Sequence, residues 1–422
     1  MTALCGLFLW EIEMVASTDI KFYAHTNNNA PKLQNAYGSM IGVLDACLVN
    51  GIQVGIVSSL TAIGTVVTAT FSAAHNLLQY QVIMITGANQ DEFNGEHRIL
   101  TVPNSNSITF QLASTPSVAT ASGTINCSLP PLGFSKPFSG SGKAAYRSTN
   151  TLLSSRPYLR VVDVIDPVWN PSYAKFAKVG IVEAMNDIDD LSGFQVPFDI
   201  SASNKNWEGT GSGSAASNGW AKWYYALSST AHISQNETQS PGNGIRPWFM
   251  FGDGDVFYLL NNVSMSDGNY IMHGFGAIDS LLQGAGNDTF LISCLNNSIA
   301  STNRTVAEKI GGVNAFKTIC LHKGLTGSSS IDAFTMGLVW DMNYASGWFD
   351  TIGTSASINQ ITSQPILYEN FVPIGKMPLL HWLYTKIPLN SGVSGRNVDF
   401  SFYPVGVSTG IVRAGQILMR IM

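Results

Sequence analysis

The sequence is poor in charge. Only 12% of its 422 residues are Asp, Glu, Lys or Arg, which is about half of the share usual in a soluble domain. The 22 Lys and Arg residues form no long basic run, so the footprint of a nucleic-acid-binding protein is missing. With a net charge of only −5, we expect a chain that buries much of its surface against partner molecules.

The sequence also lacks the patterns that metal sites and nucleophiles need. The five cysteines are odd in number and widely separated, which predicts reduced, buried thiols, no disulfide framework and no zinc site. The seven histidines form no HExxH or HxH pattern, and no GxSxG elbow is present. These absences predict that the chain is not an enzyme and has no cofactor.

Long hydrophobic runs are missing as well. The longest apolar stretches are far shorter than the ~20 residues that a membrane helix needs, so no membrane span is expected. Residues 1–10 are apolar but have neither a positively charged start nor a small-residue cleavage site, which argues against a signal peptide. We treat residues 1–18 as an N-terminal extension. Met14 is an alternative start, so the sequence leaves open whether residues 1–13 are native.

The residues that are present predict a mainly β protein, built of β-sandwich or barrel-type domains with one clear N-terminal helix. A strand–helix element spans residues 19–55. Its helix, Gly38–Asn50, has apolar residues at the i, i+3, i+4 spacing, and Ser39 is expected to cap its start. Gly51 stands where a helix-ending glycine belongs.

Two β-rich regions follow. Residues 56–129 alternate strand-like runs with turns, which predicts a small sandwich or barrel. Residues 130–422 form a larger β-rich domain that opens with a loop, residues 130–148. The strands expected in the two regions are 66–71, 80–87, 97–102, 107–112, 121–129, 158–165, 175–185, 247–252, 256–262, 270–278, 289–295, 333–340, 398–405 and 416–422.

Two groups of side chains are candidates for function. The densest acidic stretch holds Glu183, Asp187, Asp189 and Asp190. Paired acids of this kind serve glycosidases, but a solvated loop is the favoured interpretation. The aromatic run at residues 220–225 could stack on glycans or contact another subunit through Trp220, Trp223 and Tyr224, with core packing at least as well favoured.

Several blocks resemble a set of bacteriophage virion proteins. The helix reads Gly-Ser-x-Ile-x-Val-Leu-Asp-Ala-x-Leu-Val-Asn-Gly over residues 38–51, as in that family. The β segment at 68–110 resembles an immunoglobulin-like module that phage structural proteins carry. Further blocks follow in the family's order at residues 136–148, 158–163, 183–189, 246–259 and 273–280.

The resemblance implies a structural protein of the virion, in the tail or neck, with an inserted immunoglobulin-like module and no catalytic residues to transfer. We expect a homo-oligomer that contacts other virion proteins and assembles in the host bacterial cytoplasm. Three alternatives stay open. They are a tail protein that binds a glycan or receptor on the host cell surface, a depolymerase that uses Glu183 or Asp189, and a capsid decoration protein.

Overall fold

The computed structural model describes residues 16–198, 203–228, 237–265, 270–281, 288–295, 319–322, 362–364, 366–369, 372–383, 402–408 and 415–421. The protein is mainly β, with one helix near the N-terminus, which confirms the predicted fold class. It divides into two compact units. The smaller unit holds Val54–Ser128 with the residues up to Thr18, and the larger holds Asp19–Gln53 with Leu129–Met422. The chain thus leaves the larger unit at Gln53 and returns to it at Leu129.

The smaller unit is a closed barrel whose six strands are joined in the order β3-β4-β7-β6-β5-β8. Side chains alternate between the barrel core and solvent, so that Val67, Ala69 and Phe71 of β4 point inward. An immunoglobulin-like sandwich would keep two separate sheets, so the closed barrel differs from that expectation. The strands are β3 (Ile52–Ile63), β4 (Val66–Phe71), β5 (Val82–Ala88), β6 (Gly95–Asn104), β7 (Ser107–Gln111) and β8 (Gly123–Leu129), with a short 3-10 turn at Asp91–Phe93.

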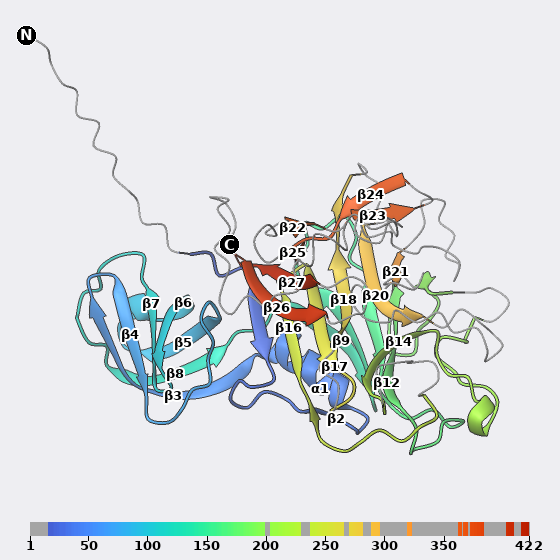
Figure 1. The fold of residues 1–422 in the computed structure, drawn as a ribbon. Coiled ribbons are helices and arrows are strands. Elements are labelled where there is room, and N and C mark those ends of the chain that lie inside the picture. Colours follow the sequence, from blue (N-terminus) through green and yellow to red (C-terminus); the bar gives the residue numbers. More distant parts are fainter. Residues whose placement is uncertain are drawn as a thin grey trace, which may run out of the picture. The chain divides into compact units, whose positions relative to one another are not determined.

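The larger unit is built on a 12-stranded antiparallel sheet (Figure 1). Ten strands follow in the order β1-β16-β17-β18-β20-β14-β12-β11-β10-β9, while β13 pairs with β12 and β21 pairs with β20. Their bounds are β1 (Lys21–Ala24), β9 (Phe134–Gly140), β10 (Lys143–Ser148), β11 (Tyr158–Val162), β12 (Lys175–Val182), β13 (Gln195–Val196), β14 (Ala221–Ala226), β16 (Trp248–Gly252), β17 (Val256–Asn262), β18 (Tyr270–Ala277), β20 (Thr289–Leu295) and β21 (Ile319–His322).

The sheet curls until its distant strands touch. Phe134 of edge strand β9 packs edge-on against Phe257 of β17, with 5.6 Å between the ring centroids. Ser148 at the end of β10 donates a hydrogen bond to the Gly254 carbonyl in the β16–β17 hairpin. Three small sheets complete the unit: β2 (Leu33–Gln34) with β15 (Ile245–Arg246); β19 (Asp279–Ser280), β24 (Val372–Lys376) and β23 (Ile366–Glu369); and β22 (Thr362–Ser363), β25 (Leu380–Leu383), β27 (Gly415–Arg420) and β26 (Phe402–Ser408).

Most expected strands are confirmed within a few residues, but the opening of the third region is not a loop. Residues 134–148 form the hairpin β9–β10 at the sheet edge. Pro137 is tolerated there because an edge strand has one side without ladder hydrogen bonds. The strand expected at residues 333–340 lies outside the described residues. No helix in the described part of the chain is long and apolar enough to cross a membrane.

The N-terminal helix is half α and half π. The α-helix α1 covers Ser39–Leu44, and a π-helix continues over Asp45–Asn50. Gly51 ends it with a φ of 74°, as predicted, and a Cβ at Gly51 would lie 2.7 Å from the Leu129 carbonyl oxygen. The predicted cap is wrong. Ser39 is the first helical residue, and its hydroxyl donates to the Ala36 carbonyl instead.

A carboxylate distant in sequence caps the helix instead. One oxygen of Asp163, which follows β11, accepts hydrogen bonds from the amides of Met40 (2.9 Å) and Ile41 (3.2 Å). The other oxygen accepts from the Tyr225 hydroxyl at 2.6 Å. Asp163 is 1% exposed, and this burial raises its pKa above the ordinary value. The side chain therefore joins the helix, β11 and β14 inside the unit.

Replacing Asp163 with alanine should destabilise the larger unit by about 3 kcal/mol, because a helix cap is lost and a buried hydroxyl loses its acceptor. Asp163→Asn keeps one acceptor oxygen and should cost about half as much. Urea unfolding followed by tryptophan fluorescence would measure both changes. A loss below about 1 kcal/mol for the alanine variant would contradict the capping role.

Candidate functional site

The aromatic run singled out in the sequence lies inside the larger unit. Trp220, Trp223 and Tyr224 are 1%, 0% and 3% exposed, respectively. The Trp223 indole donates a hydrogen bond to the Ile292 carbonyl (2.9 Å) and stacks on the His273 ring at a centroid distance of 5.3 Å. In this structure none of the three is available to a glycan or a second subunit, and core packing describes them.

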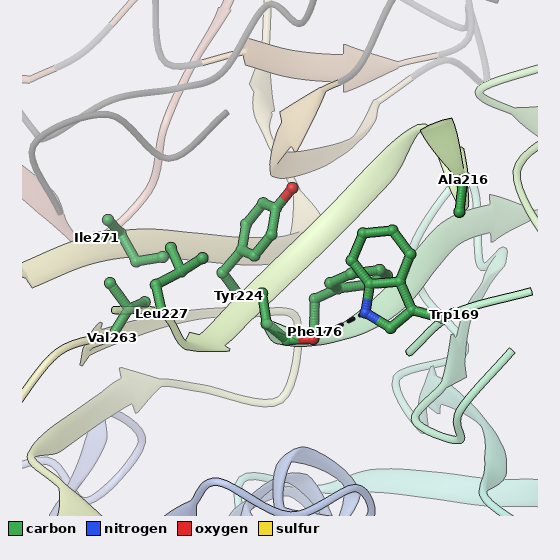
Figure 2. Packing of buried hydrophobic residues seen from close by; sticks show 8 residues of the cluster. Trp169, Phe176, Ala216, Tyr224, Leu227, Val263 and Ile271 are labelled. Carbon is green, nitrogen blue, oxygen red and sulfur yellow. Dashed lines mark hydrogen bonds between the residues drawn. The ribbon is translucent and has the colours of Figure 1, made fainter. Parts of the chain in front are cut away.

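Tyr224 belongs to an apolar cluster that includes Trp169 and Phe176 (Figure 2). Both Trp169 and Tyr224 meet the Phe176 ring edge-on, each with 5.4 Å between ring centroids. The Trp169 indole donates to the Ala174 carbonyl at 3.1 Å, which holds the segment before β12 against the sheet. Phe176 and Tyr224 lie two residues from Lys178 of β12 and Lys222 of β14, respectively. The cluster therefore lies on the same face of the sheet as these two lysines.

That face carries a row of cations across neighbouring strands. Lys178 of β12 lies directly opposite Lys222 of β14 in the antiparallel register. On β11, Arg160 lies opposite Gly180, two residues from Lys178 on the same face of β12. All three cations are buried, with exposures of 1–3%, so each needs a partner to offset the loss of water.

Lys178 is held by the segment that precedes β12. Its ammonium lies 2.9 Å from a carboxylate oxygen of Asp166, and both side chains are 4% exposed. The same oxygen of Asp166 accepts from the Gly209 amide, and the other accepts from the Val168 amide. Burial lowers the pKa of Lys178, and the hydrogen bond to Asp166 opposes that shift.

Lys222 has a partner of its own. Its ammonium lies 2.7 Å from Glu237, with side-chain exposures of 2% and 1%. The Tyr224 hydroxyl also donates to this carboxylate. The ammonium stands 4.5 Å from the centroid of the Phe176 ring, so the cation lies against an aromatic face as well. Each lysine is thus fixed by a separate covering segment.

The acidic stretch forms the exposed end of the same row. Asp189, 60% exposed, contacts both Lys143 (2.5 Å) and Arg160 (3.0 Å). The hydrogen bond from Lys143 holds the pKa of Asp189 below its usual value, and bonds from Ser192 and Asn186 lower the pKa of Asp190 to about 2. A glycosidase needs one acid with a raised pKa, and neither Asp189 nor Asp190 supplies it, so these two groups favour a structural loop.

The second pair of acids, Asp253 and Asp255, forms the β16–β17 hairpin. One oxygen of Asp253 accepts from the amides of Asp255 (2.8 Å) and Val256 (3.0 Å), which shapes the turn. Asp255 accepts two 3.0 Å bonds from the Asn150 amide group. Burial raises the pKa of Asp253 to about 6. Both side chains are occupied by bonds that hold the hairpin and the loop after β10.

Within the described ranges, no group of three His, Cys, Asp or Glu side chains could hold a metal ion. Cys47 and Cys127 are free and buried, as expected, and burial raises the pKa of both thiols. The other three cysteine side chains lie outside the described residues.

No local pattern in the sequence indicates the buried ion pairs. Asp166 lies 12 residues before Lys178, and Glu237 lies 15 residues after Lys222, so neither spacing follows a strand or helix period. Lysine in a strand usually indicates an exposed face.

No protein-family model matches the chain, and no curated protein matches it either.

Proposed function

We propose that the chain is a structural component of a bacteriophage virion, associated with the tail or neck, and that it acts through interfaces between subunits. The observation that carries this proposal is the order of the sequence blocks that resemble phage virion proteins, from Gly38 to Ser280. Most of these blocks supply buried parts of the larger unit, including the helix and strands β11, β16, β17 and β18. Such a protein is assembled in the host bacterial cytoplasm and resides in the particle.

The surface of the barrel supports an assembly role. Between residues 54 and 128 the charged residues are Asp91, Glu92, Glu96 and Arg98, and Arg98 is only 3% exposed. Burying a surface with few charges avoids much of the desolvation cost of forming an interface. The β3–β4 hairpin also presents Ile63, which is 85% exposed, beside Val66. This surface suits contact with a neighbouring protein.

The buried ion pairs of the larger unit also support a structural role. Lys178, Lys222 and Arg160 are all occupied by carboxylates that fix covering segments onto the sheet. They therefore stabilise a rigid body. The burial of Trp220, Trp223 and Tyr224 removes the observation that favoured glycan binding.

Quantitative mass spectrometry of purified particles tests the proposal. A tail or neck component should be present at a small, fixed fraction of the copies of the major capsid protein. Sedimentation of the purified chain should show a closed homo-oligomer. A copy number equal to that of the capsid protein would favour capsid decoration, and absence from purified particles would overturn the proposal.

A further inference from the structure

Among the described residues, the ion pair between Lys222 and Glu237 is the least exposed. The ammonium lies 2.7 Å from Oε1 of Glu237, and the two side chains are 2% and 1% exposed. Three buried rings, labelled in Figure 2 as Phe176, Trp169 and Tyr224, have their centroids 4.5, 5.7 and 5.8 Å from the ammonium. The amino group and the carboxyl group therefore meet inside an aromatic enclosure.

This enclosure favours the uncharged forms of the two groups. Burial takes the hydrating water from an ammonium and a carboxylate, and proton transfer between them leaves a neutral amine and a neutral acid. In these forms the amine is a nucleophile and the acid can be attacked at its carbon. The nitrogen is 2.7 Å from Oε1, and the carboxyl carbon is one C–O bond of about 1.2 Å further, so nitrogen and carbon are at most about 4 Å apart. Groups held at nearly this separation react readily.

A hydroxyl group is directed at the same carboxyl. Tyr224 donates a hydrogen bond to Oε1 of Glu237. Attack by the amine would place negative charge on a carboxyl oxygen, and a donor fixed at that oxygen stabilises the charge. The backbone of Glu237 is held as well, because its carbonyl accepts a 2.9 Å hydrogen bond from the Ala174 amide. The nucleophile, the carboxyl group and a donor are therefore positioned together.

We propose that Lys222 and Glu237 condense to an intramolecular isopeptide bond in the folded chain. The new bond joins Nζ of Lys222 to Cδ of Glu237. One carboxyl oxygen leaves as water, with one proton from the acid and one from the attacking amine, so no oxidant or co-reactant is needed. A neutral amide replaces two buried charges and ties β14 covalently to the segment that precedes β15. The proposal does not depend on the assignment to a virion.

Two other lysine–acid pairs of the larger unit are internal comparisons. Asp166, the partner of Lys178, accepts the backbone amides of Val168 and Gly209, and such bonds stabilise a carboxylate over the neutral acid. The second pair, Lys143 and Asp189, is closer at 2.5 Å, but Asp189 is 60% exposed and both groups keep contact with water. Both pairs should therefore stay ionic.

Mass spectrometry of the full-length chain, folded first and then denatured, tests the proposal. The chain should be lighter than its sequence by the mass of one water molecule. Proteolysis should release a branched peptide in which Lys222 and Glu237 are joined. A chain of full mass overturns the proposal, and so does a loss of water that maps only elsewhere, such as a succinimide at Asp253 and Gly254.

Two variants and one matched control locate the chemistry. Lys222→Met should have the full mass of its sequence. Tyr224→Phe keeps the ring and should form the bond about 100-fold more slowly, followed by mass from the time of cell-free synthesis. Lys205→Met removes a lysine that hydrogen-bonds Thr210, and this control should lose water as the wild type does. If Lys222→Met still loses water, Lys222 is excluded; an unchanged rate for Tyr224→Phe excludes a role for its hydroxyl.

Discussion

Replacing Lys178 with methionine should destabilise the larger unit by about 3–5 kcal/mol, because Asp166 would then keep a buried charge without its partner. Urea unfolding at neutral pH would measure the loss. Tryptophan fluorescence is a suitable probe, since all six tryptophans among the described residues belong to the larger unit. The signal therefore reports on the unit that contains the ion pair.

The double variant Asp166→Asn, Lys178→Met separates the ion pair from the packing around it. Removing both charges should recover part of the loss, because no charge is left buried without a partner, while the single acceptor oxygen of asparagine can keep only one of the amide bonds from Gly209 and Val168. Lys143→Met is the matched control, since its carboxylate partner is 60% exposed, and it should cost less than about 1 kcal/mol. A loss for Lys178→Met as small as for this control would refute the argument.

The barrel shows where an alternating apolar and polar pattern predicts a strand and where it does not. Strand β4 was predicted to the residue because its inward and outward positions alternate without a break. The longest barrel strand, β3, was not predicted. Its buried residues are Ile52, Val54, Val57, Leu60 and Ala62, and a bulge between Val57 and Ser59 shifts the alternation. A period-2 pattern fails wherever a bulge inserts a residue.

In the larger unit, an alternating pattern also fails to predict which side chains are buried, but for a different reason. Strand β14 is buried along its whole length, so Lys222 sits among Trp223, Tyr224 and Tyr225 with no polar face. The sequence indicated an aromatic cluster there and left both core packing and surface contact open, because burial depends on segments that arrive from elsewhere in the chain. The helix cap has the same origin. Asp163 reaches Met40 across 123 residues, a contact that no local pattern encodes.

The sequence predicts the end of the N-terminal helix but not its change of helical type. Gly51 ended the helix as predicted, because a positive φ favours glycine whatever surrounds it. The change from α to π turns at Asp45 was not predicted. There Tyr146 and Lys136 both bond to the Asp45 carboxylate, which ties the second half of the helix to β10 and β9. Tertiary contacts of this kind are invisible in the sequence.

Acid should destabilise the larger unit through His273. This ring is 0% exposed and stacks on Trp223, and burial lowers its pKa from 6.5 to about 3. The folded chain therefore holds the neutral ring, while the unfolded chain takes up a proton below pH 6.5. The stabilising contribution is complete above pH 6.5 and is lost as the pH falls toward 3.

Between pH 6.5 and 4.5 this one site should lower the free energy of unfolding by about 2–3 kcal/mol, since each pKa unit is worth about 1.4 kcal/mol. His273→Phe keeps an aromatic ring against Trp223 and cannot be protonated. Over the same pH range the free energy of unfolding of this variant should therefore fall by about 2–3 kcal/mol less than that of the wild type. The comparison with wild type is needed because Asp253, with its raised pKa, contributes with the opposite sign. Urea unfolding at several pH values would give both curves, and parallel curves would show that His273 does not titrate with folding.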